Sequence, residues 1–344
     1  MYLKLKPILF EQTYFYWFLK EERSLINKFN RTTGKTLTDE QWHQSVMEVE
    51  HVSLLIKKYI SETYNFDEIT VKNEQIQIEK IITDIFKQLK MYIIISRTDG
   101  IDDFTSKNII KNDSILYKIK NVILPKKYFS SKKEFNTDKS LSFISSNLHF
   151  SKYGLCRDYS LYFLTIFQLL GFELDKFTIV ILPGHMINRY IGKNFQLNIE
   201  SMNEQWKLYN LFMPNSYYLE EYKLMDGVSE KTGFLQNGSD KLIRAQFYYN
   251  FANLLFHHFK DYDMAKLNYE SAINLIHTDA FFYFNYANLL ATHFKSEKTI
   301  PYIIKQYKNF LKYAICYDDE TKSYVIFANT FLRRYDSESN VETD

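Results

Sequence analysis

The chain is poor in the residues that cross-link a fold or interrupt its regular elements. Its 344 residues include only two cysteines, nine glycines and five prolines. Because Cys156 and Cys316 lie far apart in the sequence, we expect no disulfide framework, and a reducing compartment is the simpler interpretation. A phosphate-binding Gly-x-x-x-x-Gly-Lys-[Ser/Thr] loop and a Gly-rich dinucleotide turn are both missing. The sequence therefore predicts no organic cofactor.

Long hydrophobic runs and an excess of one charge are missing as well. The most apolar window, residues 91–96, is far shorter than the ~20 residues that cross a bilayer. The N-terminal run ends at Glu11 without a signal-peptide cleavage site. The 43 basic and 41 acidic residues leave a formal net charge of +2, which gives no reason to expect nucleic acid or an anionic membrane as a partner. We expect a cytoplasmic protein without a membrane span.

The N-terminal region, residues 1–125, has the apolar periodicity of helices. A capping box at Thr38 and Gln41 begins one helix, whose apolar side is formed by Trp42, Val46, Val49, Leu54, Ile56 and Ile60. A second helix is expected over residues 73–95, with an apolar side formed by Ile76, Ile78, Ile81, Ile82, Ile85, Phe86 and Leu89. A third is expected over residues 107–123. The region is predicted to be a helical bundle without chemistry of its own.

A polar stretch after Pro125 begins a second region, residues 126–232. An apolar helix is predicted here over residues 156–170, with Gly171 as its left-handed cap. Three strand-like runs follow at residues 177–182, 186–191 and 195–199, and the last two flank a hairpin turn. The region is thus predicted to be a helix followed by an antiparallel sheet, which makes the chain α+β.

A repeated sequence marks the third region, residues 240–335. The segment Asn-Phe-Ala-Asn-Leu-Leu at 250–255 recurs as Asn-Tyr-Ala-Asn-Leu-Leu at 285–290, an offset of 35 residues. Periods of about 34 residues with paired helices are typical of tetratricopeptide-type arrays. The packing positions of that repeat are held in the first copy by Ala265, Tyr269 and Ala272, whereas alanine is replaced in the second by Ile300 and Pro301.

This pattern predicts two or three degenerate helical hairpins, followed by a polar tail over residues 336–344. Stacked helical hairpins form a concave surface that binds peptides or partner helices. We therefore expect a protein or peptide substrate or partner to bind this region.

The segment Gly154-Leu155-Cys156-Arg157-Asp158-Tyr159-Ser160 places a cysteine in the first turn of the predicted helix. Unpaired N–H groups and a partial positive charge at a helix N-terminus favour the thiolate, which is the nucleophilic form. Arg157 adds a cation, and Asp158 complements the helix end. A buried structural cysteine is the alternative, because free cysteines are among the most buried residues. We interpret Cys156 as a nucleophile.

A candidate base and its orienting residue follow on the predicted strands. His185 comes directly after Pro183-Gly184, where its ring can project over a helix end and take the thiol proton. Asn198 and Glu200 lie two residues apart on the next strand and so share a face. Either can accept the second imidazole N–H and fix its tautomer. We favour Asn198, with Glu200 as the alternative.

Donors for a developing oxyanion are less well defined by the sequence. The backbone N–H of Cys156 is the expected first donor, and Tyr153 or Asn147 is the candidate second one. The pair His257-His258 is interpreted as helix surface, because no further Cys or His cluster has the spacing of metal ligands. No metal site is predicted.

The cysteine segment resembles the transglutaminase-like superfamily, the papain-like group that includes microbial cysteine proteases and amidases. Its common motif, Gly-x-Cys-x-Asp-[Phe/Tyr]-[Ala/Ser], is matched at each position of residues 154–160. The resemblance covers roughly residues 130–230. It implies a papain-like core in which Cys156 is the nucleophile and His185 is the base. Some bacterial members carry tetratricopeptide repeats after this core, which agrees with the repeat in this chain.

Two positions depart from that family pattern. The third member is usually Asp, whereas the matching strand here offers Asn198 and Glu200. An aromatic residue often follows the His, but Met186-Ile187-Asn188 stands there instead.

The sequence thus predicts a thiol-dependent acyl-transfer enzyme that attacks an amide carbonyl through Cys156. Release of the acyl group to water would make it a protease or amidase, and release to an amine would make it a transglutaminase. The alternative is a catalytically inactive scaffold that binds protein partners through its helical repeats, as the two departures allow. A third hypothesis is that the helices of residues 1–122 regulate access to the site.

Overall fold

The computed structural model describes residues 3–23, 39–92, 94–95, 153–154, 156–200, 211–315 and 319–338. The chain divides into two compact units, Met1–Ile179 with His185–Met213 and Val180–Gly184 with Pro214–Asp344. Eleven α-helices and a four-stranded antiparallel sheet lie within the described residues, so the chain is α+β, as predicted. The three-part division of the sequence stays a prediction. None of the described helices is both long enough and apolar enough to cross a membrane.

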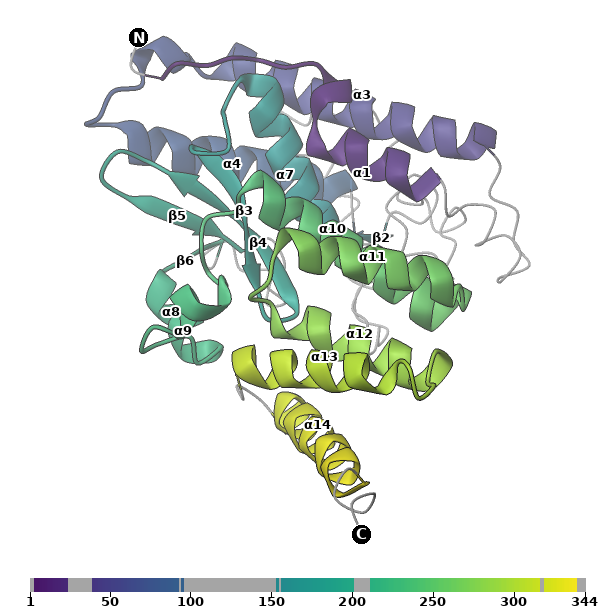
Figure 1. Ribbon diagram of the computed structural model, residues 1–344. Helices are drawn as coiled ribbons and strands as arrows, with labels where there is room; N and C mark the ends of the chain where they lie inside the picture. Colours follow the sequence, from purple (N-terminus) through teal and green to yellow (C-terminus); the bar gives the residue numbers. More distant parts are fainter. Residues whose placement is uncertain are drawn as a thin grey trace, which may run out of the picture. The chain divides into compact units, whose positions relative to one another are not determined.

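In the first unit, helices from the N-terminal part of the chain pack around the buried helix α7 (Cys156–Leu170). Figure 1 shows α1, α3 and α4 beside it. The elements that precede α7 are η1 (Phe10–Gln12), α1 (Tyr14–Arg23), α3 (Asp39–Thr63), η2 (Phe66–Glu68), α4 (Glu74–Tyr92), β1 (Ile94–Ile95) and β2 (Tyr153–Gly154). The short strands β1 and β2 pair in parallel.

The first two predicted helices are present as α3 and α4, and most of their predicted apolar residues are buried. The predicted end of the second helix is wrong, because Ile94 and Ile95 form β1. The prediction is wrong at Leu54 and Ile76, which are 41% and 57% exposed. Leu54 lies two residues after the buried Val52, and Ile76 lies two residues before the buried Ile78. Two residues correspond to a rotation of about 200° around a helix, so both side chains point away from the buried face. Thr38 and the helix predicted over residues 107–123 lie outside the described residues.

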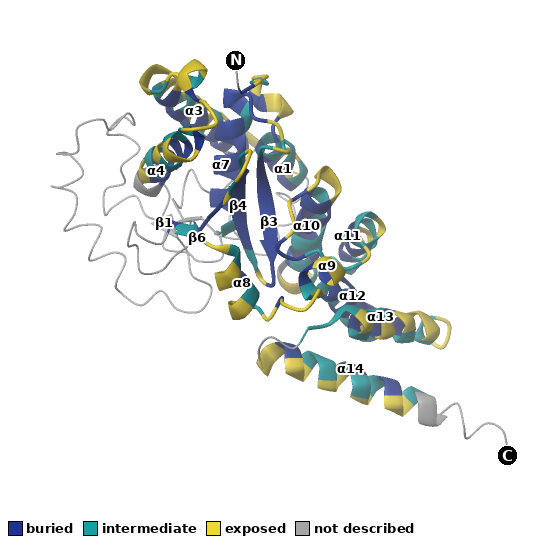
Figure 2. Cartoon of the chain, turned by 90° about the vertical axis from the view of Figure 1, so that its left-hand side faces the viewer, coloured by how far each residue is buried: buried dark blue, intermediate teal, exposed yellow. Residues whose placement is uncertain are grey.

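The helix α7 is buried along almost its whole length, as the dark blue ribbon in Figure 2 shows. A helix that is apolar on all sides is stable only when other elements surround it. It ends at Gly171, whose φ of 101° lies in the left-handed region, as predicted. The carbonyl of Gly171 accepts a hydrogen bond from the Lys6 N–H at 2.8 Å, and a Cβ at Gly171 would lie 2.5 Å from that nitrogen. Glycine is therefore required there both by conformation and by space.

The sheet follows α7 in the order β3 (Phe177–Leu182), β4 (His185–Ile191), β5 (Gln196–Ile199) and β6 (Phe212–Met213). All six residues of β3 are buried, which fits its continuous apolar run. The Gly192 N–H donates to the Phe195 carbonyl at 2.9 Å and closes the hairpin between β4 and β5. The predicted strands and hairpin are confirmed, and α7 packs on β4.

The second unit continues with helices that pack one after another. They are α8 (Asn215–Glu221), α9 (Val228–Thr232), α10 (Asp240–Asn253), the π-helical η7 (Leu254–Phe259), α11 (Tyr262–Leu275), α12 (Ala280–His293), α13 (Ile300–Tyr313) and α14 (Asp319–Glu338). Each helix from α10 to α13 packs against the next, so that α10–α11 and α12–α13 form two helical hairpins (Figure 1).

The packing residues of the two hairpins correspond, but with a shift that the sequence prediction did not contain. On α11 the buried positions include Ala265, Tyr269 and Ala272; on α13 the equivalent buried positions are Ile303, Tyr307 and Phe310. The offset is thus 38 residues on these helices rather than 35, because three more residues lie between the repeated segment and α13 than between it and α11. The assignment of Ile300 and Pro301 to the alanine position is therefore wrong. Pro301 lies instead in the first turn of α13, where its missing N–H has little cost.

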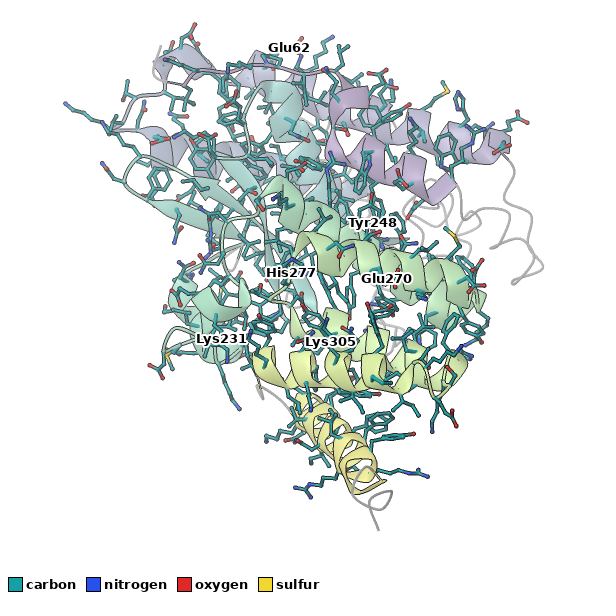
Figure 3. The ribbon with its side chains drawn as sticks, viewed as in Figure 1. Glu62, Lys231, Tyr248, Glu270, His277 and Lys305 are labelled. Carbon is teal, nitrogen blue, oxygen red and sulfur yellow. The ribbon has the colours of Figure 1, made fainter. Side chains whose placement is uncertain are left out.

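Neutral polar pairs link the helices of each hairpin. The Tyr269 hydroxyl of α11 donates to Asn253 Oδ1 of α10 at 2.6 Å, and the Tyr307 hydroxyl of α13 donates to Asn288 Oδ1 of α12 at 2.7 Å. We call these two pairs the tyrosine–asparagine ladder. Between the hairpins, Glu270 of α11, labelled in Figure 3, accepts a hydrogen bond from the Tyr286 hydroxyl at 2.5 Å.

Candidate active site

The candidate nucleophile and base both belong to the first unit. Cys156 is the first residue of α7 and His185 is the first residue of β4. The thiol is half-buried, and it is a hydrogen-bond partner of the His185 side chain. Two residues that are 29 positions apart in the sequence are thus brought together at the starts of adjacent elements.

Hydrogen bonds between α7 and β4 fix these two residues in place. The Ser160 hydroxyl, one turn after Cys156, donates to the Met186 carbonyl at 3.3 Å. In return, the Asn188 side-chain amide donates to the Ser160 carbonyl at 3.1 Å. Ser160 and Asn188 are both fully buried, so these bonds are shielded from water. They fasten the first turn of the helix to the first residues of the strand.

Glu200 provides the third group of the site. It follows β5 directly, and both of its carboxylate oxygens lie near His185 Nε2, at 3.1 and 2.9 Å. Its own N–H donates to the Leu211 carbonyl at 2.8 Å, which holds the backbone in place. Since Nε2 faces the carboxylate, Nδ1 is the ring nitrogen left for the sulfur of Cys156. In this arrangement a carboxylate binds one ring nitrogen and orients the imidazole, while the other ring nitrogen accepts the proton of the nucleophile.

The preference for Asn198 as the third member is corrected by this geometry. Asn198 Oδ1 accepts a hydrogen bond from Arg189 Nε at 2.6 Å, and its amide donates to the Met213 carbonyl at 3.0 Å. The cause is the strand register, in which Asn198 lies directly opposite Arg189. Arg189 is four residues along β4 from His185, or about 13 Å at the usual rise of a strand. Glu200 shares the face of Asn198 but lies two residues closer to the base.

The electrostatics of the site favour a charged pair. Burial raises the pKa of the Cys156 thiol, but the hydrogen bond and charge of His185, the Met186 N–H and the Arg157 guanidinium outweigh burial and lower that pKa below its ordinary value. Burial lowers the pKa of His185, but its interactions with Cys156 and Glu200 outweigh burial and raise it. Both shifts stabilise a thiolate beside an imidazolium near neutral pH.

The remaining predicted site residues lie where less of the chain is described. Tyr153 lies on β2, where only its backbone is described, and Asn147 lies outside the described residues, so the oxyanion donors stay predictions. His257 is exposed on η7, and the side chain of His258 is not among those described. Where the structure describes the chain, no group of three or more His, Cys, Asp or Glu side chains is placed to hold a metal ion.

Two buried charged residues of this unit were not identified from the sequence. Arg189 is only 3% exposed within β4, and Glu22 is only 1% exposed on α1. Glu22 shares the buried face of α1 with Phe15, Phe18 and Leu19, and the neighbours of Arg189 in β4 are buried as well. A charge on the buried side of an element is the signal that could have marked them.

No protein-family model matches this chain, and no curated protein or solved structure matches it either.

Proposed function

We propose that this chain is a transglutaminase-like thiol enzyme, which transfers an acyl group from an amide by means of Cys156, His185 and Glu200. The observation that carries the proposal is the Glu200 carboxylate 2.9 Å from His185 Nε2, together with a Cys156 thiol whose pKa the His185 side chain lowers. The order of helix α7 and strands β3, β4 and β5 supports a papain-like core. A site that depends on a free thiol fits a reducing compartment, and we propose a cytoplasmic location.

The geometry supports the following reaction. The Cys156 thiolate attacks the amide carbonyl carbon, and the oxyanion that forms meets the N–H groups at the start of α7. The C–N bond breaks as the His185 imidazolium gives its proton to the leaving amine, which leaves a thioester on Cys156. Water or a second amine then attacks the thioester, His185 takes the proton of the attacking group, and the thiolate is released. Glu200 keeps the imidazole oriented and stabilises its charged form throughout.

The test is the rate of iodoacetamide alkylation as a function of pH, measured in a Cys316→Ser background so that Cys156 alone reacts. We expect a thiol pKa well below the free-cysteine value of about 8.5, and we expect His185→Ala to raise it. Because the imidazolium is the largest single cause of the lowered pKa, an unperturbed thiol, or one indifferent to His185→Ala, would contradict a working pair. A positive result justifies assays with amide substrates, with and without added amines.

A binding role for the helical array is the second candidate function. The two hairpins α10–α11 and α12–α13 pack in succession through α11 and α12, and they carry corresponding buried residues. This is the construction that presents a binding surface in repeat proteins. This function requires no reactive thiol, so the alkylation profile separates it from the first candidate. An ordinary thiol pKa in a folded protein favours a scaffold that binds a protein or peptide partner.

A further inference from the structure

We infer that helix α1 is part of the reactive centre, because its Phe18 and Glu22 hold the guanidinium of Arg157 next to the Cys156 nucleophile. Arg157 is then a positioning residue for the reaction, and α1 is what keeps it in position. This inference rests on the proposed function and adds to it a group from the far N-terminal part of the chain.

Arg157 is an unusual residue in the first turn of α7 because it is only 9% exposed. Its Nε and Nη2 atoms both lie 3.3 Å from Asp158 Oδ1, and Asp158 is fully buried. Burying an arginine is costly unless it is paired and its donors are satisfied. Two adjacent residues on one helix cannot surround a guanidinium, so its other side must be covered by another element.

Helix α1 supplies that cover. Its buried residues are Phe15, Phe18, Leu19 and Glu22, which recur at the spacing of one helical face. The Arg157 guanidinium carbon lies 4.9 Å from the centre of the Phe18 ring, a cation–π contact. Glu22 is 1% exposed, and its negative charge acts on Arg157. The buried Arg157 cation thus explains why a glutamate, Glu22, stands on the otherwise apolar buried face of α1.

The charges around the sulfur are arranged in two pairs. His185 faces the thiol from β4, with the Glu200 carboxylate behind it. Arg157 acts on the thiol from α7, with Asp158 and Glu22 as its counter-charges. Of these groups, the two cations lower the pKa of Cys156. A guanidinium held by a carboxylate and an aromatic face is fixed in direction, whereas a solvated one would be screened by water.

The first test compares Arg157→Met and Arg157→Lys by the pH profile of alkylation in the Cys316→Ser background. We expect Arg157→Met to raise the thiol pKa by about one unit, the usual effect of losing one nearby opposite charge. Arg157→Lys keeps the cation and should restore most of the wild-type profile. Equal thiol pKa values in the wild type and in Arg157→Met would overturn the role of Arg157.

The second test addresses α1 and also serves if Arg157→Met does not fold. Phe18→Leu removes the aromatic face under the guanidinium but keeps an apolar side chain. Phe15→Leu is the matched control, because Phe15 is equally buried on the same helix but contacts Tyr162 of α7 instead, with ring centres 4.9 Å apart. We expect Phe18→Leu alone to raise the thiol pKa, by less than Arg157→Met does.

Two results would remove α1 from the reactive centre. One is a thiol pKa that does not change in Phe18→Leu, and the other is an equal change in both leucine variants, which would indicate general loosening of α1. Failure of the proposed function looks different, because the wild-type thiol would then be unperturbed before any substitution. A low wild-type thiol pKa that responds to His185→Ala but not to Arg157→Met or Phe18→Leu rejects only the roles of Arg157 and α1.

Discussion

The two units bury polar groups in different ways. Around Cys156 the buried polar side chains include two charged pairs, a histidine on a glutamate and an arginine on an aspartate. In the helical array the tyrosine–asparagine ladder is made of neutral hydroxyl and amide groups, as in the bond from Tyr269 to Asn253. Both arrangements satisfy their hydrogen bonds, but only the first holds charge that can be used on a reacting molecule.

The difference bears on why each kind of polar group is buried. A neutral buried hydrogen bond makes a modest net contribution to the free energy of unfolding, and neither partner needs a counter-ion. A buried charged pair gains less than its desolvation costs in many proteins, so it is weak evidence for a stabilising role. Because two such pairs lie at the start of α7, we infer that they are there for function rather than for stability. This agrees with the tendency of perturbed pKa values to cluster at functional sites.

The largest effect is expected when the carboxylate behind His185 is removed. Glu200→Ala leaves the imidazole without its orienting group, and we expect kcat/KM on an amide substrate to fall about a thousandfold. Glu200→Gln should reduce kcat/KM by a smaller factor, because its amide oxygen still accepts the imidazole N–H although the negative charge is gone. The two variants thus separate orientation of the ring from stabilisation of its charge.

Asn198→Ala is the matched control, since it changes the neighbouring polar residue of the same strand face. It removes the acceptor of Arg189 and should lower the free energy of unfolding by about 2 kcal/mol, the effect of losing a hydrogen bond to a buried charged group. Its kcat/KM should change less than about tenfold, because Asn198 does not orient the base. A larger loss of kcat/KM in Asn198→Ala than in Glu200→Ala would restore Asn198 as the third member of the site.

The second prediction concerns a buried acid in the otherwise neutral array. Asp279 caps α12 and accepts hydrogen bonds from the Phe281 N–H and the Gln246 amide, at 3.0 and 2.8 Å. Burial raises its pKa to about 6, although these bonds oppose the shift. The folded state therefore holds this proton more tightly than the unfolded state. The contribution of Asp279 to stability is thus largest below pH ~4 and is lost as the pH rises through about 6.

Asp279→Asn keeps a good capping residue and removes the charge. We expect its free energy of unfolding to exceed that of the wild type by about 3 kcal/mol at pH 7, and to match it near pH 3.5. Urea unfolding of both proteins at the two pH values measures this difference. A variant less stable than the wild type at pH 7 would show that the carboxylate is stabilised by its environment. The array would then also hold a stabilised buried charge, and the contrast between the two units would be wrong.

Local structure was predictable where one element carries its own pattern. The apolar run of α7, its cap at Gly171 and the hairpin between β4 and β5 each depend on neighbouring residues, and all are confirmed. The alternation of Asn198 and Glu200 predicted that both lie on one face of the strand, although β5 ends at Ile199. It could not choose between them, because the choice depends on how β5 is registered against β4.

Contacts between distant segments were not predictable from local pattern. Glu22 interrupts the apolar face of α1, which signals a buried charge but does not identify the partner, since Arg157 lies 135 positions further along. Likewise, the repeated segment fixed α10 and α12 in register, whereas the longer connection before α13 moved the packing positions of that helix to Ile303 and Tyr307. Length changes in a connection leave no trace in the periodicity of the helix that follows.

The smallest effect is expected in the tyrosine–asparagine ladder itself. Tyr307→Phe keeps the buried ring of α13 and removes only the hydroxyl that donates to Asn288 Oδ1. The loss of one neutral hydrogen bond should lower the free energy of unfolding by about 1 kcal/mol. The alkylation profile of Cys156 should stay as in the wild type, because a neutral group in the array carries no charge to the thiol. A shift of the thiol pKa in Tyr307→Phe would mean that the array and the reactive centre are coupled, and the separation of a stabilising unit from a reactive one would then fail.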